Sequence, residues 1–259
     1  MRLSPADLLV LQEVGGPGLC QIARGARKVL FNQNAYYSFH GFNDLEGPLP
    51  PYLDPEFVAT LVVSEDNRRY LEHAFPGLRC RRIRVSLDLE RFAWVPEAQK
   101  RCRIAFMTRK NHADVMQVLQ ILRSRQALRH WRLAPIENQD EAGVARLMGE
   151  AKIFLAFGHP EGICLSNLKA MARGCRVVGY SGMGCRESFA NDLCHEVPVG
   201  DVIAFARAVE VEMARFDAGS SGLKQSLDDS SRYVHAGFSA EAERADLLEV
   251  YSELLEGSA

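Results

Sequence analysis

The sequence predicts an α/β protein in which helices cover both faces of parallel sheets. From residue 101 onward, short apolar runs alternate with amphipathic segments. The runs are apolar almost throughout, as in "KIFLAFG" (152–158) and "CRVVGYS" (175–181). This is typical of strands that are buried on both faces. Strand–helix alternation with such strands favours a parallel sheet with crossover helices.

The second half of the chain contains the clearest elements. Two more apolar runs are predicted to be strands, "RCRIAFMT" (101–108) and "HWRLAPIE" (130–137). Apolar residues at helical spacing follow these runs: Val115, Leu119 and Leu122 on one helix, and Val144, Leu147 and Met148 on the next.

Helix boundaries in this half are indicated by capping residues. The helix "SNLKAMARG" (166–174) is expected to carry Lys169 in its first turn and to end at Gly174, because glycine adopts left-handed backbone readily. Asp201 and Ser239 are predicted to open two later helices.

The first 86 residues repeat the pattern less clearly. The strand candidates are "DLLVLQEV" (7–14), "RKVLFNQ" (27–33), "TLVVS" (60–64) and "CRRIRVS" (80–86), and Ser64 is expected to cap a helix. Since one βαβ unit takes 30 or more residues, this segment has room for two or three βα steps. We therefore expect a partial first domain at 1–86 and a second domain at 87–259. The last helix is expected to pack back on the first domain.

Composition narrows the class of protein. The 259 residues carry a net charge of −2, which gives no reason to expect binding to nucleic acid. Seven scattered cysteines without C-x-x-C pairs indicate reduced thiols in a cytoplasmic protein and predict no zinc site. We also expect no signal peptide and no transmembrane segment, which leaves contact with the inner face of the membrane open.

Three loops in the second half are candidates for binding an anion. Arg109 and Lys110 follow the first strand, Ile136 follows the second, and "GHPEGICLSN" (158–167) leads from the third into a helix. Ligands bind parallel sheets at the carboxyl ends of strands, and free amides at a helix start favour anions. An arginine, a lysine and such amides would suit a diphosphate. The alternatives are a solvated strand end, a simple turn and an exposed loop acid at Glu161.

Other motifs carry less weight. "GGPG" (15–18) and "GMGCRE" (182–187) lack the third glycine of a dinucleotide-binding loop and are better interpreted as turns. "RCRRIR" (79–84) is interpreted as a charged edge strand, although an anionic acceptor is an alternative. His40 is a candidate catalytic base, with a structural histidine as the alternative.

The segment "PEGICLSNLKAMARGCRVVG" (160–179) resembles the donor site of retaining GT-B glycosyltransferases, E-G-F-G-L-P-x-L-E-A-M-A-x-G-x-P-V-V. The matching residues include Glu161, Gly162, Leu165, Leu168, Ala170, Met171, Ala172, Gly174, Val177 and Val178. Ser64, Asp88 and Phe92 match a second pattern, which ends the N-terminal domain of that family. The resemblance implies two Rossmann-like domains, of which the first is shortened.

The same resemblance implies transfer of a hexosyl or deoxyhexosyl group from a nucleotide sugar to a glycan or lipid-linked acceptor, in polysaccharide biosynthesis. Arg109 and Lys110 would neutralise the diphosphate, and the amides of Gly162, Ile163 and Cys164 would bind it. Ile136 is a further expected donor contact, and Glu161 would contact the sugar. No metal or other cofactor is expected, because the protein supplies the cations.

The chain departs from the family pattern at three places. Lys169 replaces a second glutamate that binds the nucleotide ribose, and Cys164 replaces a glycine. Lysine donates hydrogen bonds but cannot accept them, so we expect Lys169 to contact phosphate, with a solvent-facing lysine as the alternative. The third departure is the short first domain.

Two other functions are alternatives to an active transferase. The shortened domain is compatible with a non-catalytic or partner-dependent subunit of the same fold, completed by a homo-oligomer or another chain. A different nucleotide-using α/β enzyme, such as an epimerase or a dehydrogenase, would need a dinucleotide loop that the sequence does not show.

Overall fold

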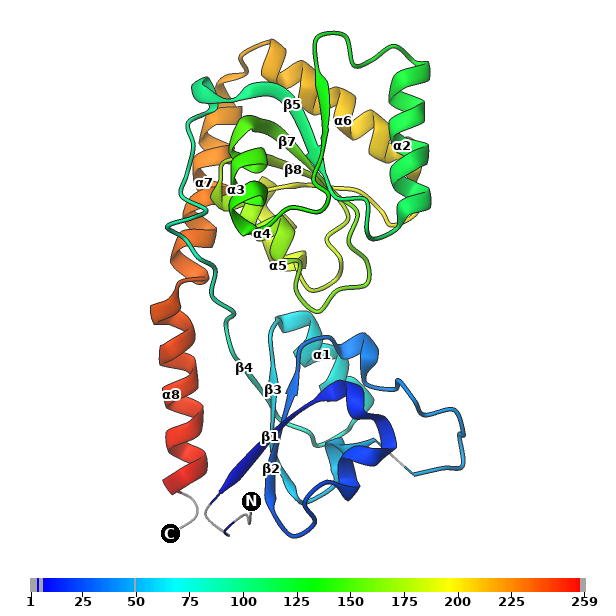
Figure 1. Ribbon diagram of the computed structural model, residues 1–259, viewed down its shortest axis with the longest axis vertical. Helices are drawn as coiled ribbons and strands as arrows, with labels where there is room; N and C mark the ends of the chain where they lie inside the picture. Colours follow the sequence, from blue (N-terminus) through cyan, green and yellow to red (C-terminus); the bar gives the residue numbers. More distant parts are fainter. Residues whose placement is uncertain (1–3, 5–6, 49, 257–259) are drawn as a thin grey trace. The chain divides into compact units, whose positions relative to one another are not determined.

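The computed structural model describes residues 4, 7–48 and 50–256. The chain divides into two compact units, each with its own sheet (Figure 1). Unit 1 contains the chain up to Ser86, Glu161–Ile163 and the chain from Ala240. Unit 2 contains Leu87–Pro160 and Cys164–Ser239. The predicted α/β class with parallel sheets is confirmed, because every strand pair in both sheets is parallel.

Unit 1 has a four-stranded sheet in the order β1-β2-β3-β4. Its strands are β1 Leu8–Gln12, β2 Arg27–Asn32, β3 Phe57–Val62 and β4 Cys80–Arg82. Its helices are α1 Glu65–Ala74 and α8 Ala240–Glu256, with short 3-10 helices η1 Glu13–Gln21, η2 Ala35–Tyr37 and η3 Pro51–Leu53. The predicted strands are confirmed, and the charged strand β4 lies at the sheet edge as expected. Ser64 caps α1, because its side chain accepts a hydrogen bond from the Asn67 amide at 3.2 Å.

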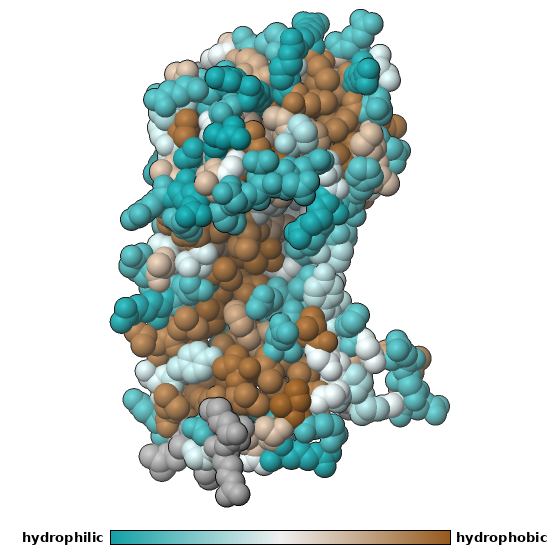
Figure 2. Space-filling view, in the orientation of Figure 1, coloured by the Kyte–Doolittle hydropathy of each residue, from teal (hydrophilic) through white to brown (hydrophobic). Residues whose placement is uncertain are grey.

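The two faces of the unit 1 sheet are covered differently. Because successive side chains of a strand point to opposite faces, Leu30 packs with Leu71 of α1 while its neighbour Val29 packs with Val250 of α8. The α8 face is less completely covered: Val10 of β1 is 45% exposed. Figure 2 shows apolar side chains gathered over the strands of unit 1 beside α8.

Helix α8 is also joined to unit 1 by an ion pair. The Arg84 guanidinium donates to both carboxylate oxygens of Asp246, at 2.8 and 2.6 Å, and the Arg84 amide donates to the same carboxylate at 2.8 Å. Bidentate pairing of this kind gives directional as well as electrostatic stabilisation. It fixes the register of α8 against the segment that follows β4.

Unit 2 has a five-stranded sheet in the order β6-β5-β7-β8-β9. Its strands are β5 Arg101–Phe106, β6 Arg132–Pro135, β7 Ala151–Ala156, β8 Arg176–Gly179 and β9 His195–Glu196. Its helices are α2 His112–Ser124, α3 Glu141–Glu150, α4 Leu165–Ala172, α5 Arg186–Phe189, α6 Val202–Asp217 and α7 Ser221–Gly237, with 3-10 helices η4 Glu97–Gln99 and η5 Ala190–Asp192.

Helices cover both faces of this sheet (Figure 1). On one face α2 and α6 enclose an apolar core that includes Ile104, Phe106, Val115 and Phe205. On the other face α3 and α4 pack on the strands, and α7 packs on α4. The sheet is therefore doubly wound, as the continuous apolar strands predicted.

Two of the predicted helix boundaries are confirmed and one position is corrected. The Asp201 side chain accepts from the Ala204 amide at 2.8 Å, and Gly174 follows α4 with a left-handed φ of 74°. Lys169 does not lie in the first turn of its helix, because α4 begins at Leu165. The opposition between the Lys169 charge and the helix dipole, expected for a first-turn lysine, therefore does not apply.

Within the described residues, no helix is both long and apolar enough to cross a membrane.

Candidate functional site

The strand order of unit 2 reverses between β5 and β7. From β5 the chain passes to β6 on one side, and then returns to form β7 on the other side. In open parallel sheets, ligands bind where such a reversal places two loops at the carboxyl ends of neighbouring strands. Here those loops are residues 107–111, after β5, and residues 157–160, after β7. The loops with Arg109 and His159 are separated by a strand in the sequence, yet they leave adjacent strands in the sheet.

Asn111 joins these two loops. Its side-chain amide donates to the carbonyl oxygens of Phe157 at 2.6 Å and His159 at 3.2 Å. Its backbone is left-handed, with φ of 48°, a conformation that asparagine adopts more easily than most residues. Sequence reasoning missed Asn111, although an asparagine directly before an amphipathic helix is a signal for a helix start.

Arg109 and Lys110 lie in the loop between β5 and Asn111. Arg109 is exposed and Lys110 is half-buried. The preceding residue, Thr108, donates its hydroxyl to a carboxylate oxygen of Glu137 at 2.7 Å, which joins this loop to the one after β6. A second link is made by Ile136, which is buried and whose amide donates to the Phe106 carbonyl at 2.8 Å. These two bonds hold the cationic loop to the segment after β6, and Asn111 holds it to the segment after β7.

The loop after β7 contains the segment that resembles a donor site. Glu161 and Ile163 are half-buried, and Gly162 is buried. These three residues belong to unit 1, while Pro160 and Cys164 on either side belong to unit 2.

Cys164 directly precedes α4 and already has protein partners. Its amide donates to the sulfur of Cys185 at 3.1 Å, and its thiol lies 3.5 Å from the Ser181 carbonyl. A diphosphate bound by the Cys164 amide would therefore have to replace a thiol as acceptor. Because sulfur is a weak acceptor, a charged phosphate oxygen is the stronger partner for this amide.

Lys169 forms an ion pair with Glu141, the first residue of α3. The Lys169 ammonium lies 2.7 and 3.0 Å from the two carboxylate oxygens of Glu141, and 5.1 Å from the centre of the Phe92 ring. Its side chain is 17% exposed, so it does not extend into solvent. Glu141 lies 28 residues from Lys169 in the sequence, so no local pattern relates the two residues.

His40 lies in unit 1, in the turn after η2. Its side chain is exposed, and its amide donates to the Tyr37 carbonyl at 2.9 Å. Its role as a base stays a prediction.

The comparisons with known proteins agree on the architecture. No family model matches the chain. An α-1,6-glucosyltransferase of Actinobacillus pleuropneumoniae serotype 7 is 23% identical over 244 residues, which cover 89% of this chain and 69% of that protein. The structure is similar to sucrose-phosphate synthase from Thermosynechococcus elongatus, with a TM-score of 0.70, 15% identity, and coverage of 96% of this chain and 74% of that one.

A glycosyltransferase from Rickettsia africae gives a TM-score of 0.69 at 14% identity, over 96% of this chain and 77% of that one. The chain has the GT-B fold. The resemblance to GT-B glycosyltransferases predicted from the sequence is thereby confirmed. Arg109 and Lys110 of the GT-B chain lie after its strand β5, at the reversal of strand order.

Proposed function

We propose that this GT-B chain is a glycosyltransferase that moves a sugar from a nucleotide-sugar donor to an acceptor hydroxyl. The observation that carries the proposal is the reversal of strand order between β5 and β7, with Arg109 and Lys110 in the first of the two loops. The relative in Actinobacillus is named a glucosyltransferase, and a further similar structure is that of a pneumococcal O-GlcNAc transferase in complex with UDP and GlcNAc. That structure has a TM-score of 0.64 and 14% identity, and this chain covers 57% of it.

The chemistry of sugar transfer explains why two cations would be needed. The bond between the anomeric carbon and the diphosphate breaks, and a bond from that carbon to the acceptor oxygen forms. Negative charge develops on the departing diphosphate, and the acceptor proton passes to a base, for which His40 is the predicted residue. Removing one preorganised donor to such a developing charge costs about 10²–10³ in rate. Arg109 and Lys110 would supply this stabilisation, so the proposal requires no bound metal for transfer.

The Lys169–Glu141 pair suggests how the donor site differs from the family pattern. A lysine can only donate hydrogen bonds, whereas a nucleotide ribose also presents hydroxyl donors. Glu141 supplies carboxylate oxygens within 3.0 Å of the Lys169 ammonium. We therefore assign the two residues a joint role in binding the nucleotide sugar. Lys169 donates hydrogen bonds to its oxygen atoms, and Glu141 accepts hydrogen bonds from its ribose hydroxyls.

Calorimetric titration with UDP, GDP, ADP, TDP and CDP tests the donor site. At least one nucleoside diphosphate should bind, and the Arg109→Ala/Lys110→Ala variant should bind it at least tenfold more weakly. Arg123→Ala, which removes an exposed arginine from the end of α2, is the matched control and should leave affinity unchanged. Absence of binding by every nucleotide at millimolar concentration would remove the proposal.

A second candidate is a GT-B subunit that needs a partner to act. It is favoured by the incompletely covered α8 face of unit 1, where Val10 is 45% exposed. Another similar structure is a GtfA/B complex, with a TM-score of 0.66 and 16% identity. Light scattering of the purified chain shows whether it forms a homo-oligomer. Sugar transfer by the isolated monomer would rule this candidate out.

We also propose an acceptor class and a cellular location. A glycan or lipid-linked acceptor would bring the protein to the inner face of the cytoplasmic membrane. Co-sedimentation with vesicles that contain anionic lipid tests this location, and protein that stays entirely in the supernatant would contradict it.

A further inference from the structure

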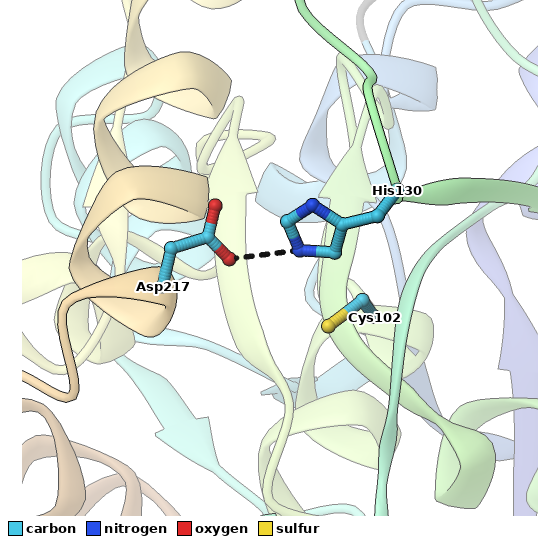
Figure 3. Close-up of side chains that lie close together, drawn as sticks. All are labelled: Cys102, His130 and Asp217. Carbon is cyan, nitrogen blue, oxygen red and sulfur yellow. Dashed lines mark hydrogen bonds and ion pairs between the residues drawn. The ribbon is translucent and has the colours of Figure 1, made fainter.

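Three side chains of different chemistry meet at the amino-terminal edge of the unit 2 sheet. They are Cys102, the second residue of β5, His130, two residues before β6, and Asp217, the last residue of α6. Their ligand atoms all lie within 4.8 Å of one another. Figure 3 shows the three side chains turned toward the same space. We call them the Cys102–His130–Asp217 cluster.

The set has the chemistry of a transition-metal site. A thiolate, an imidazole and a carboxylate are the three kinds of protein ligand that Zn²⁺ takes. In a tetrahedral site, bonds of about 2.0–2.3 Å separate ligand atoms by roughly 3.5 Å. The His130 Nε2 and Asp217 Oδ1 atoms are 3.1 Å apart, and no two ligand atoms of the cluster are more than 4.8 Å apart. The charges also match, because a thiolate and a carboxylate together balance a divalent cation.

A neighbouring group, Trp131, orients one of the three ligands. The Trp131 indole is 2% exposed, and its N–H lies 3.2 and 3.4 Å from the two carboxylate oxygens of Asp217. The His130 Nε2 atom lies 3.1 Å from Asp217 Oδ1, and its ring lies against Trp131 with centres 6.0 Å apart. The Trp131 N–H is an outer donor of the kind that orients metal ligands, whereas the direct His130–Asp217 contact would be replaced by bonds to a shared ion.

The cluster is also accessible from solvent. The His130 and Asp217 side chains are 55% and 40% exposed, while Cys102 is partly buried at the rim of the apolar core. An exposed His–Asp contact alone would be an ordinary weak surface pair. The thiol distinguishes this place, because cysteine adds a soft ligand that Ca²⁺ and Mg²⁺ avoid and Zn²⁺ prefers.

We propose that Cys102, His130 and Asp217 bind one Zn²⁺ ion, with water completing the coordination. The site lies at the amino-terminal ends of the strands, whereas the loop with Arg109 and Lys110 lies at their carboxyl-terminal ends. Its metal would join β5, the segment before edge strand β6, and the end of α6. The ion is structural, and its removal lowers stability without removing sugar transfer.

The test uses Co²⁺ as a coloured substitute and Trp131 as an internal reporter. The chain has two tryptophans, so Trp94→Phe leaves Trp131 alone. Co²⁺ added to the untagged, reduced Trp94→Phe protein should produce a thiolate-to-cobalt absorption band and quench Trp131 fluorescence at the same concentrations. Zn²⁺ should reverse both changes by displacement.

Ligand variants and matched controls assign the site. Cys102→Ser, His130→Ala and Asp217→Asn should each weaken Zn²⁺ binding at least tenfold. Cys20→Ser and His112→Ala, which change another incompletely buried thiol and another exposed histidine, should leave it unchanged. In the Cys20→Ser background the other five cysteines are buried, so Zn²⁺ should protect one thiol, Cys102, from iodoacetamide.

Each failure is informative. If the Trp94→Phe protein shows neither band nor quenching at millimolar Co²⁺, the site does not exist. If Cys102→Ser binds Zn²⁺ as tightly as the parent protein, the thiol is no ligand and the proposal is wrong. Circular dichroism of each variant shows whether a loss of binding reflects a loss of folding. Protection of Cys102 by Zn²⁺ in the Cys20→Ser protein, which keeps all three ligands, measures Zn²⁺ binding independently.

Discussion

The two ends of β5 in unit 2 both carry a lysine, and the two lysines are held very differently. Lys100 directly precedes β5 at the amino-terminal edge and is buried, and its ammonium lies 3.2, 3.4 and 3.0 Å from the carbonyl oxygens of Met148, Gly149 and Ala151. Lys110 follows β5 at the carboxyl-terminal edge, in a loop beside exposed Arg109. Burial lowers the pKa of the Lys100 ammonium. The three carbonyl oxygens accept hydrogen bonds from this ammonium and hold it in position.

The comparison separates stability from ligand binding. A cation surrounded by backbone carbonyls joins β5 to the end of α3 and the start of β7. A cation in a loop where strand order reverses lies where α/β folds bind ligands. Changes at the amino-terminal edge should therefore lower stability and leave donor binding intact, whereas changes at the carboxyl-terminal edge should do the reverse.

The largest expected effect is at the carboxyl-terminal edge. Arg109→Ala should reduce sugar transfer by about 10²–10³-fold, because one donor to the departing diphosphate is lost. Its free energy of unfolding should stay within about 0.5 kcal/mol of the parent value, because the side chain is exposed. Steady-state kinetics and urea unfolding measure the two quantities. If the Arg109→Ala variant is destabilised but fully active, Arg109 has a structural role and not a catalytic one.

Lys100→Met should show the opposite behaviour. The Met148 and Ala151 carbonyls keep the Cys175 thiol as a donor, whereas the Gly149 carbonyl loses its Lys100 donor. An unsatisfied buried group costs about 1–3 kcal/mol, so we expect a loss of that size in unfolding free energy. Affinity for the nucleoside diphosphate should not change. Arg101→Met, at the exposed neighbouring position, is the control and should cost less than about 1 kcal/mol. Equal losses in the two variants would contradict a structural role for Lys100.

The Lys169–Glu141 pair lies between these extremes, and a charge exchange separates its two roles. Lys169→Glu would place two carboxylates together, so unfolding free energy should fall by up to about 1 kcal/mol. Nucleoside diphosphate affinity should fall about tenfold, because a charged hydrogen bond is lost. The Lys169→Glu/Glu141→Lys double variant should recover stability but not affinity. An unchanged dissociation constant in Lys169→Glu would show that the pair has no part in donor binding.

The smallest effect concerns the half-buried Arg84–Asp246 pair of unit 1. The hydrogen bonds from Arg84 hold the pKa of Asp246 below its usual range. A lowered native pKa contributes stability that is present above the ordinary value, about 4, and is lost as pH falls through the native value. Hydrogen exchange in α8 should therefore accelerate below about pH 4. Asp246→Asn should remove this pH dependence, and identical acid profiles would contradict the assignment.

Much of the fold follows from local patterns. Continuous apolar runs predicted the strands of both sheets, because a parallel strand covered on both faces needs no polar side. Ser64, Asp201 and Gly174 marked helix ends correctly, since caps act within a few residues of the chain. The helix start was predicted one residue too late, because α4 begins at Leu165 and not at the polar residue Ser166, which places Lys169 just beyond the first turn.

The candidate site could be predicted only in part. Loops that follow apolar strands gave Arg109, Lys110 and the segment around Gly162 as candidates, and their roles stay predictions. Asn111 and Glu141 were missed, because their partners are distant in the sequence. The spacing of cysteines and histidines predicted no zinc site, yet folding brings Cys102 within reach of His130 and Asp217.

The sequence by itself determined the alternation of strands and helices and their caps, because these depend on neighbouring residues. The tertiary structure decided that β7 lies beside β5, that Lys169 pairs with Glu141, and that a thiol, an imidazole and a carboxylate share one space. The physical reason is the order of strands in the sheet. Strand order sets which loops and side chains become neighbours, and local sequence patterns do not specify it.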